Sequence, residues 1–283
     1  MKKIITILAL ATATGISAMA GTITVKGSDT LLILAQKWAE TYMGAHTDVK
    51  ISVSGGGSGI GFAALQSQTT DLCDASRKIK PAEQMKCAAV FEGGKRPTEY
   101  KVALDGLSVY VNPENPLKEL SVAQVGDIFT GKIKNWKEVG GPDAPITVYS
   151  RENSSGTYEF FKEHVLKGKD FAASAQTMPG TAAIVQAVVK DKNGIGYGGA
   201  AYGGSSKLLA IKKTDTSPAI APTEETVMNG TYPIWRHLFV YVDPAKDKGD
   251  IAAYLTWIRS DEGQKYVKDV GYYPLPKNLR SGN

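Results

Sequence analysis

Three short stretches rich in Gly, Ser and Thr each lie between a strand-like run and a helix-like run. They are KGSDT (26–30), SGGGSG (54–59) and SRENSSGT (150–157). The first turn of a helix has backbone N–H groups without partners inside the helix, and the helix dipole favours negative charge there. Glycines let an anion approach this backbone, and hydroxyl groups add further donors. Three such turns brought together would enclose a small tetrahedral oxyanion.

Each stretch also has a purely structural interpretation. Ser28, Asp29 or Thr30 fits an ordinary helix N-cap. The loop around Ser58 fits a tight turn against a neighbouring helix, although a cap needs fewer small residues than the five glycines and two serines of 54–61. Arg151 offers a planar fork of donors four residues before Ser155, which suits an oxyanion, but many surface arginines have similar neighbours. The three stretches together favour an anion site more than any one of them does.

Known nucleotide and catalytic motifs do not match the glycine loop. It lacks the lysine of G-x-x-x-x-G-K-[ST], and Phe62 stands at the last glycine position of G-x-G-x-x-G. Ile60 stands at the last glycine position of G-x-S-x-G around Ser58. We therefore expect a binding protein without a catalytic residue and without a cofactor.

A secreted hydrolase is the alternative from another functional class. It would use Ser58 or Ser155 as the nucleophile and would need His164 or His237 beside that serine. The three histidines are scattered along the sequence and show no spacing typical of metal ligands, so we expect no metal site.

The elements that would position these stretches alternate between strand and helix, which is typical of α/β architecture with largely parallel sheets. Apolar patterning predicts strands at 22–27, 49–55, 101–113 and 146–150, and helices at 30–44, 60–68, near 121–129, 156–166, 181–191 and, as one or two helices, 251–270.

Two extended apolar segments, 102–113 and 233–244, share a V-Y-V-[ND]-P ending. They predict that the chain crosses twice between two lobes, although ordinary neighbouring core strands would have the same pattern. The first lobe would comprise residues 21–108 and 240–283, and the second lobe would comprise residues 109–239.

The N-terminus resembles a secretory signal peptide over residues 1–20. Lys2 and Lys3 precede a short apolar run at 4–13, and Ala18-Met19-Ala20 supplies a small-residue cleavage pattern before Gly21. No later run approaches the length of a membrane span. We expect an exported, periplasmic protein.

Net charge argues against one class of partner, and the two cysteines bear on disulfide bonding. Removing Lys2 and Lys3 lowers the formal charge from +5 to about +3, which is far from the basic patches of a nucleic-acid binder. In an oxidising compartment, Cys73 and Cys87 favour a disulfide bond, and a pair of buried free thiols is the alternative.

The order and spacing of several motifs resemble the periplasmic phosphate-binding proteins of ABC-type importers. The motifs are GSDT (27–30), SGGGSGIG (54–61), TDLCDASRKI (70–79), YSRENSSGTYEFF (149–161), GIGYGG (194–199) and YPIWRHLFVYV (232–242). The resemblance covers nearly the whole mature length. It implies a type II periplasmic binding protein, with two lobes of mixed sheets that close on the ligand at a two-segment hinge.

The resemblance also implies a ligand set and partners. The ligand would be inorganic phosphate, the partner a membrane ABC permease, and the protein a monomer. The implied ligand-binding residues are Ser28, Thr30, Leu31 through its backbone N–H, Ser58, Ser76, Arg77, Arg151, Ser155, Gly156 and Thr157.

One position departs from the pattern of some family members. Those members carry an aspartate, which accepts the proton of the ligand, where this chain has Arg77. A carboxylate binds P–O–H but repels fully ionised sulfate. Asp29 and Asp74 are the candidates for this role here, although Asp29 also fits a cap and Asp74 a residue that orients Arg77. Sulfate, molybdate, tungstate and a phosphonate are therefore the alternative ligands.

Overall fold

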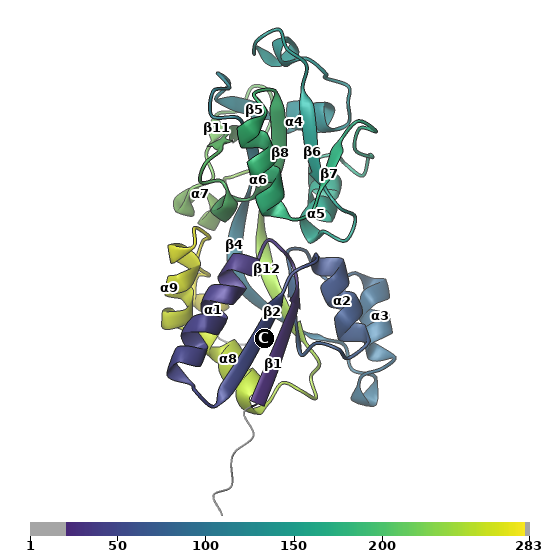
Figure 1. Cartoon of the computed structure of the whole chain (residues 1–283), viewed down its shortest axis with the longest axis vertical. Coiled ribbons are helices and arrows are strands. Elements are labelled where there is room, and N and C mark those ends of the chain that lie inside the picture. Colours follow the sequence, from purple (N-terminus) through teal and green to yellow (C-terminus); the bar gives the residue numbers. More distant parts are fainter. Residues whose placement is uncertain (1–20, 281–283) are drawn as a thin grey trace, which may run out of the picture.

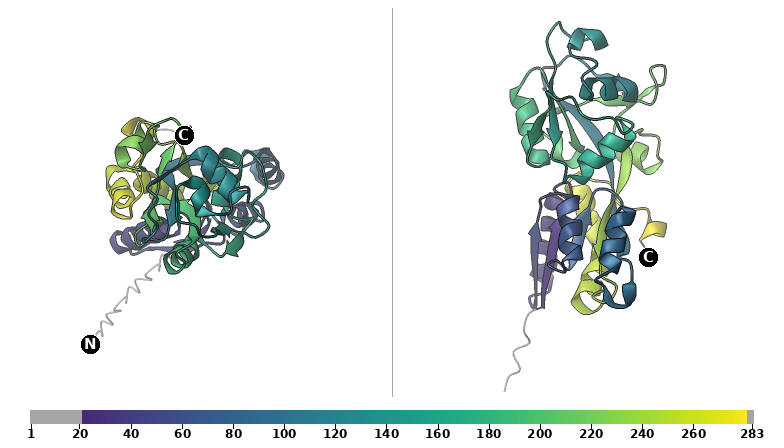
Figure 2. Two further views of the ribbon diagram at one scale, coloured as in Figure 1. Left: turned by 90° about the horizontal axis from the view of Figure 1, so that it is seen from above. Right: turned by 90° about the vertical axis from the view of Figure 1, so that its right-hand side faces the viewer.

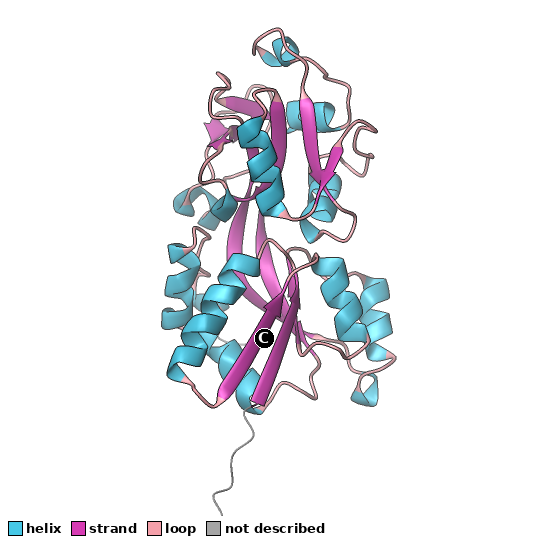
Figure 3. Cartoon of the chain, viewed as in Figure 1, coloured by secondary structure: helices cyan, strands magenta, loops and turns pink. Residues whose placement is uncertain are grey.

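The structure is a computed structural model of the 283-residue chain and describes residues 21–280, so the expected signal peptide lies outside the described residues. Figure 1 shows two bodies stacked along the long axis, with strands β4 and β12 passing from one to the other. Figure 2 shows the same division from the side. Both bodies combine strands with covering helices (Figure 3), which confirms the expected α/β class and two-lobe arrangement.

The lower lobe in Figure 1 is built around one end of a long mixed sheet, in the strand order β2-β1-β3-β12-β4. Strands β1, β2 and β3 are parallel, whereas β12 runs antiparallel to β3 and β4. Its elements are β1 (Gly21–Gly27), α1 (Leu32–Ala45), β2 (Val49–Ser54), α2 (Ser58–Gln66), β3 (Leu72–Ala75), α3 (Pro81–Ala88), part of β4 (Thr98–Val111), part of β12 (Trp235–Val242), α8 (Gly249–Arg259) and α9 (Asp261–Asp269).

The upper lobe continues the sheet in the order β4-β8-β6-β7, and a small sheet of β11, β10 and β5 lies beside it. Strands β6, β7 and β8 are parallel, and β4 is antiparallel to β8 and β9. Its elements are β5 (Glu119–Ser121), α4 (Val122–Phe129), β6 (Thr147–Arg151), α5 (Gly156–His164), β7 (Gln176–Met178), α6 (Thr181–Lys190), β8 (Gly194–Gly199), β9 (Lys207–Leu208), β10 (Ala210–Lys212), β11 (Ala219–Ile220) and α7 (Glu224–Met228).

Helices cover both faces of the sheet in each lobe, because each helix buries one apolar stripe. In the lower lobe, α1, α8 and α9 share one core cluster, and α2 and α3 share another. In the upper lobe, α4 and α5 pack on one side and α6 on the other. This layering brings the first turns of α1, α2 and α5 to the boundary between the lobes (Figure 1).

The crossing strands change from one core to the other over a few residues. Ala103 packs in the lower core, whereas Leu104 belongs to the upper core. Ile234, directly before β12, belongs to the upper core, and Leu238 on β12 belongs to the lower one. The segment around Leu275 returns to the upper core. The cores therefore meet along β4 and β12, while the lobe boundaries at 108/109 and 239/240 stay a prediction.

Cys73 and Cys87 are free thiols in the structure, which corrects the expected disulfide bond. Both side chains are fully buried in the apolar cluster of Phe62 and Tyr241. In such surroundings a thiol packs as a small apolar group. Burial raises the pKa of both thiols, that of Cys87 to about 11, so neither cysteine is in its reactive thiolate form near neutral pH.

Candidate anion-binding site between the lobes

Four hydroxyl groups meet at the boundary between the lobes. Thr30 Oγ1 lies 2.7 Å from Thr157 Oγ1, and Ser76 Oγ lies 3.4 Å from both Thr157 Oγ1 and Ser58 Oγ. Thr30, Ser58, Ser76 and Thr157, called the hydroxyl cluster below, are each at most 1% exposed. Three come from the lower lobe and Thr157 comes from the upper lobe, so both lobes contribute to the cluster.

Helix starts hold three of these hydroxyls in place. Thr30 lies in the turn that leads into α1, Ser58 is the first residue of α2, and Thr157 is the second residue of α5. Ser76 follows strand β3, and its backbone N–H donates to Ser58 Oγ over 3.0 Å. The expected convergence of three helix N-termini is therefore present, and it concentrates backbone N–H groups and positive dipole ends at one point.

Two glycines make this close approach sterically feasible. Gly57 precedes α2 with a φ of +97°, in the region that favours glycine, and a Cβ there would clash with the Ser154 carbonyl of the other lobe. A Cβ at Gly156 would collide with Ser58 Oγ. The glycine loop thus allows close contact between the lobes and also supplies backbone N–H donors.

The remaining residues expected near Thr30 and at the start of α5 have structural partners. The backbone N–H of Ser28 donates to the Asp74 carbonyl over 2.9 Å, and that of Leu31 donates to the Ser28 carbonyl over 3.1 Å. Ser155 is the N-cap of α5 and accepts from the backbone N–H of Tyr158. These residues lie beside the hydroxyl cluster, and the structure uses them to build the turns.

Arg151 is buried between the lobes and bound to acids on both sides of the boundary. Its Nη2 donates to Asp29 Oδ2 over 2.7 Å and to Glu152 Oε1 over 2.9 Å, and its Nη1 donates to Thr181 Oγ1. Burial disfavours the charged guanidinium, but Glu152 and Asp29 outweigh burial and raise the pKa of Arg151. Arg151 therefore keeps a positive charge at the boundary.

Arg77 points to a different set of partners. Its guanidinium forms two hydrogen bonds with the Glu83 carboxylate, at 2.7 and 2.8 Å, and an ion pair with Glu159 Oε2 at 2.5 Å. Lys80 also pairs with Glu159, at 2.8 Å. Within residues 21–280, Arg77 makes no hydrogen bond to the hydroxyl cluster. Since Glu159 belongs to α5 of the upper lobe, the structure places Arg77 in an ion-pair network across the boundary.

The two acids considered as proton acceptors differ in their surroundings. Asp29 accepts from Gly56 N over 2.9 Å and from Arg151, so its carboxylate is fully engaged. Asp74 is fully buried, and burial raises the pKa of its carboxyl to about 7. Among the described residues, the Asp74 carboxyl has no hydrogen-bond or ion-pair partner. It lies one residue from Ala75 and two from Ser76, next to the cluster in sequence.

The contacts across the boundary describe a closed arrangement of the lobes. Gly59 N donates to the Ser154 carbonyl over 2.9 Å, and Ser154 Oγ donates to the Gly56 carbonyl over 3.0 Å. Tyr202 OH donates to the Asp29 carbonyl over 2.6 Å. Hydroxyl donors, helix N-termini and arginines enclosed in this way suit the sequestration of an anion from water, where charge-assisted hydrogen bonds are strongest.

Comparisons with known proteins agree with this geometry. The profile of the PBP superfamily domain matches residues 12–262. The phosphate-binding protein PstS of Pseudomonas aeruginosa is 35% identical over 279 residues, which cover 93% of this chain and 86% of the relative. The Staphylococcus epidermidis PstS is 37% identical over 260 residues, which cover 89% and 78%. The chain belongs to the PBP superfamily and, within it, to the family of PstS phosphate-binding proteins.

A solved structure shares the fold of this PstS family member. It is a Clostridium perfringens protein described as a phosphate ABC transporter substrate-binding protein with bound phosphate. It superimposes with a TM-score of 0.82 at 28% identity, covering 90% of this chain and all of the other.

The sequence motifs did not predict a buried ion pair that contacts the hydroxyl cluster. Arg236 Nη2 donates to Thr157 Oγ1 over 3.0 Å, its Nη1 donates to the Ser76 carbonyl, and its Nε and Nη2 bind Asp105 Oδ2 at 2.9 and 2.8 Å. Arg236 and Asp105 face each other in the register of β12 and β4. The signal in the sequence was an arginine and an aspartate within the two extended segments expected to cross between the lobes, because charges are rarely buried unless they are paired.

The hydrolase alternative gains no support from the site of this PstS family member. Ser58 Oγ bonds with Ser76, and Ser155 Oγ accepts from a backbone N–H. Within residues 21–280, no histidine hydrogen-bonds to either serine. His46 stacks on Tyr42, and His164 and His237 line a separate pocket. In the same range, no group of three His, Cys, Asp or Glu residues could hold a metal ion.

Proposed function

We propose that this chain captures inorganic phosphate between its lobes and delivers the ion to an ABC-type membrane permease. The observation that carries the proposal is the hydroxyl cluster, which draws donors from both lobes and from three helix starts. The named ligand of the PstS relatives and of the Clostridium perfringens protein supports the choice of phosphate. The protein makes and breaks no covalent bond in this function.

The proposed contacts fall into two groups. Thr30, Ser58, Ser76 and Thr157 donate hydroxyl hydrogen bonds, and Arg236 and Arg151 supply positive charge beside them. Arg77 favours the closed arrangement of the lobes through its ion pair with Glu159. It would contact the phosphate ion only after breaking that ion pair. The remaining members of the expected set shape the turns around the cluster: Ser28, Leu31, Ser155 and Gly156.

Location and partners follow from the proposed function. We propose that residues 1–20 direct export and are removed, and that the mature protein acts in the periplasm as a monomer without nucleic acid. Among residues 21–280, no helix is both long and apolar enough for a bilayer crossing. We also propose lobes of 21–108 with 240–283, and of 109–239, which meet along β4 and β12.

Calorimetric titration tests the proposal. The purified protein is unfolded, dialysed to remove bound ions, refolded and titrated with inorganic phosphate. We expect heat from one site per chain with micromolar or tighter affinity. No heat at millimolar phosphate, from protein with a native circular dichroism spectrum, contradicts it.

A thermal-shift panel separates phosphate from other oxyanions. Sulfate, molybdate, tungstate and methylphosphonate are compared with phosphate at equal concentration, because stabilisation grows as RT ln(1 + [L]/Kd). Phosphate should give the largest increase in melting temperature. A larger increase with another ion would assign the site to that ion.

A further inference from the structure

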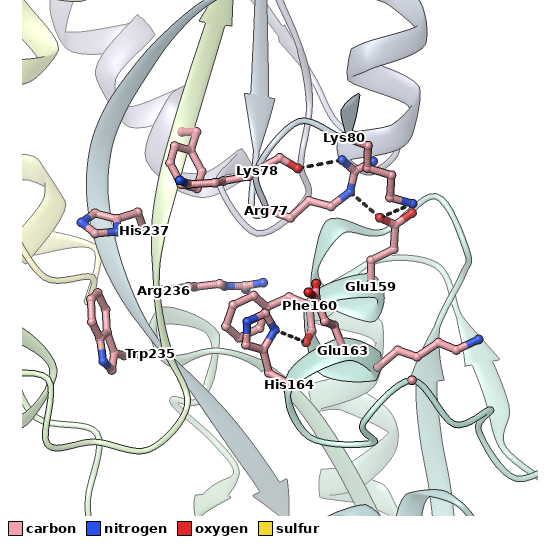
Figure 4. Close-up of a pocket in the computed structure, with 13 residues that line it drawn as sticks. Arg77, Lys78, Lys80, Glu159, Phe160, Glu163, His164, Trp235, Arg236 and His237 are labelled. Atoms are coloured by element: carbon pink, nitrogen blue, oxygen red, sulfur yellow. Dashed lines mark hydrogen bonds and ion pairs between the residues drawn. The ribbon is translucent and has the colours of Figure 1, made fainter. Parts of the chain in front are cut away.

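A pocket with a volume of about 630 Å³ lies at the lobe boundary beside the crossing strand β12 and apart from the hydroxyl cluster. Its lining comes mainly from Arg77, Lys78 and Lys80 of the lower lobe, from α5 of the upper lobe and from the crossing strand β12 (Figure 4). No member of the hydroxyl cluster lines it. Arg236 is the link, since it lines the pocket and donates to Thr157. The volume is in the range of small-molecule sites.

Aromatic rings from two elements line this pocket. Trp235, His237 and Phe239 alternate along β12, and their neighbouring ring centres lie 5.4 and 6.1 Å apart. Phe160 and His164, one turn apart on α5, are stacked with ring centres 4.0 Å apart. In Figure 4, His237 and Trp235 lie on one side of the β12 ribbon, and Phe160 and His164 lie on the other. Such surfaces favour flat, unsaturated ligands.

The charges of the lining leave one cation available. Four of its five Lys and Arg side chains are paired with acids: Arg77 with Glu83 and Glu159, Lys80 with Glu159, Lys162 with Asp170, and Arg236 with Asp105. The fifth is Lys78, which is exposed. Within the described part of the chain, its ammonium group has no hydrogen bond or ion pair.

Lys78 and His237 line the same pocket, which places this free charge near the His237 ring (Figure 4). Burial, followed by the positive charges of Lys101 and Lys78, lowers the pKa of His237 to about 4. His237 is therefore a neutral ring near pH 7. The acid of the lining without a partner in the described residues is Glu163, which lies on α5 beside His164 (Figure 4).

We propose that this pocket binds a flat aromatic molecule carrying one anionic group. The ring packs against Phe160 and His164 of α5, and the anionic group binds the ammonium of Lys78 beside His237. This site shares only Arg236 with the proposed phosphate site, and the proposal does not depend on phosphate binding. Because both lobes and the crossing strand supply its lining, an occupant contacts all three parts of the closed protein.

A fluorescent probe of this chemistry tests the proposal directly. Titration with 8-anilinonaphthalene-1-sulfonate should show saturable binding of one molecule per chain with micromolar affinity. Lys78→Gln should weaken binding about five-fold, less than the loss expected for a buried charge-assisted contact because Lys78 is exposed. Lys50→Gln, which removes another exposed lysine without a partner in the described residues, should bind as the unmodified protein does. Equal affinity of the Lys78 and Lys50 variants would overturn the proposal.

Two further measurements distinguish probe binding in this pocket from probe binding elsewhere on the protein. His237→Ala should weaken probe binding while leaving the circular dichroism spectrum unchanged. Excess inorganic phosphate should not displace the probe, and displacement would place the probe at the hydroxyl cluster and overturn the proposal. Non-saturable binding of several probe molecules would also overturn it. Absence of phosphate binding would affect only the proposed function.

Discussion

Arg77 Nε lies 2.5 Å from Glu159 Oε2 and so joins the segment after β3 in the lower lobe to α5 in the upper lobe. Lys80 adds a second contact to the same carboxylate at 2.8 Å. Arg77 is 7% exposed and Glu159 is 23% exposed, so water screens this pair less than a surface pair. Arg77 and Lys80 thus form an ion-pair network that joins the two lobes.

Glu159→Gln should weaken phosphate binding about three- to ten-fold, because it removes both ion pairs that favour closure while leaving Arg77 paired with Glu83. Titration calorimetry and stopped-flow release rates measure the change, and release should become faster. Glu163→Gln on the same helix is the control and should change neither quantity. Equal affinities of the two variants would refute the closure role of Glu159.

Arg77→Asp should weaken the binding of phosphate and sulfate by similar factors. The new carboxylate would face Glu83 and Glu159 and would repel them, which opposes closure for any ligand. Affinities for the two ions measured side by side check this expectation. A marked change in the ratio of the two affinities would instead place residue 77 against the ion.

Arg151→Ala should lower phosphate affinity at least ten-fold, because a buried charge-assisted contact contributes about 1.5–3 kcal/mol. Arg151→Lys should rescue only part of this loss, since one ammonium cannot hold Asp29, Glu152 and Thr181 in the geometry of the guanidinium. Lys192→Ala, which removes a surface pair with Glu114, is the control. Wild-type affinity in Arg151→Ala would exclude Arg151 from the site.

Asp105→Asn should lower the free energy of unfolding by about 3 kcal/mol, because it leaves the buried Arg236 guanidinium without a carboxylate. Urea denaturation measures the loss. Glu114→Gln, at an exposed ion pair with Lys192, should change stability by less than about 0.5 kcal/mol. A loss as small as that of the control would show that the buried pair is not essential to the hinge.

Asp74→Asn should raise the melting temperature above pH 7 and have little effect near pH 4. The raised pKa means that the folded state holds the proton up to about pH 7, while the unfolded state releases it near pH 4. Wild-type stability from this group therefore falls as pH rises from about 4 to about 7. Asp215→Asn, at an exposed acid, is the control. An equal effect of Asp74→Asn at both pH values would contradict the burial of an ionisable Asp74.

Apolar patterns predicted much of the fold because the residues that form each pattern lie within one short stretch of the sequence. The apolar spacing of 30–44 placed α1, where the buried residues include Leu34, Trp38 and Tyr42. The glycine-rich strand β8 and the short β3 had no such pattern. Gly196 and Gly198 occupy β8 because side chains there would collide with Ile184 and Thr181 of α6, a constraint imposed by tertiary packing.

The contacts in the candidate site were predictable where residues lie at helix starts and not where they depend on distant partners. Thr30, Ser58 and Thr157 share one local chemistry and meet as expected. The partner of Arg77 is 82 positions away in Glu159, and that of Arg236 is 131 positions away in Asp105. The neighbouring sequence does not distinguish an arginine that binds a ligand from one that pairs with a distant acid.

A crystal structure of the refolded protein with millimolar inorganic phosphate tests the central claim most directly. We predict a tetrahedral ion between the lobes, within hydrogen-bond distance of the hydroxyls of Thr30, Ser58, Ser76 and Thr157. Closed lobes without such an ion, or a phosphate bound elsewhere on the chain, would contradict the account.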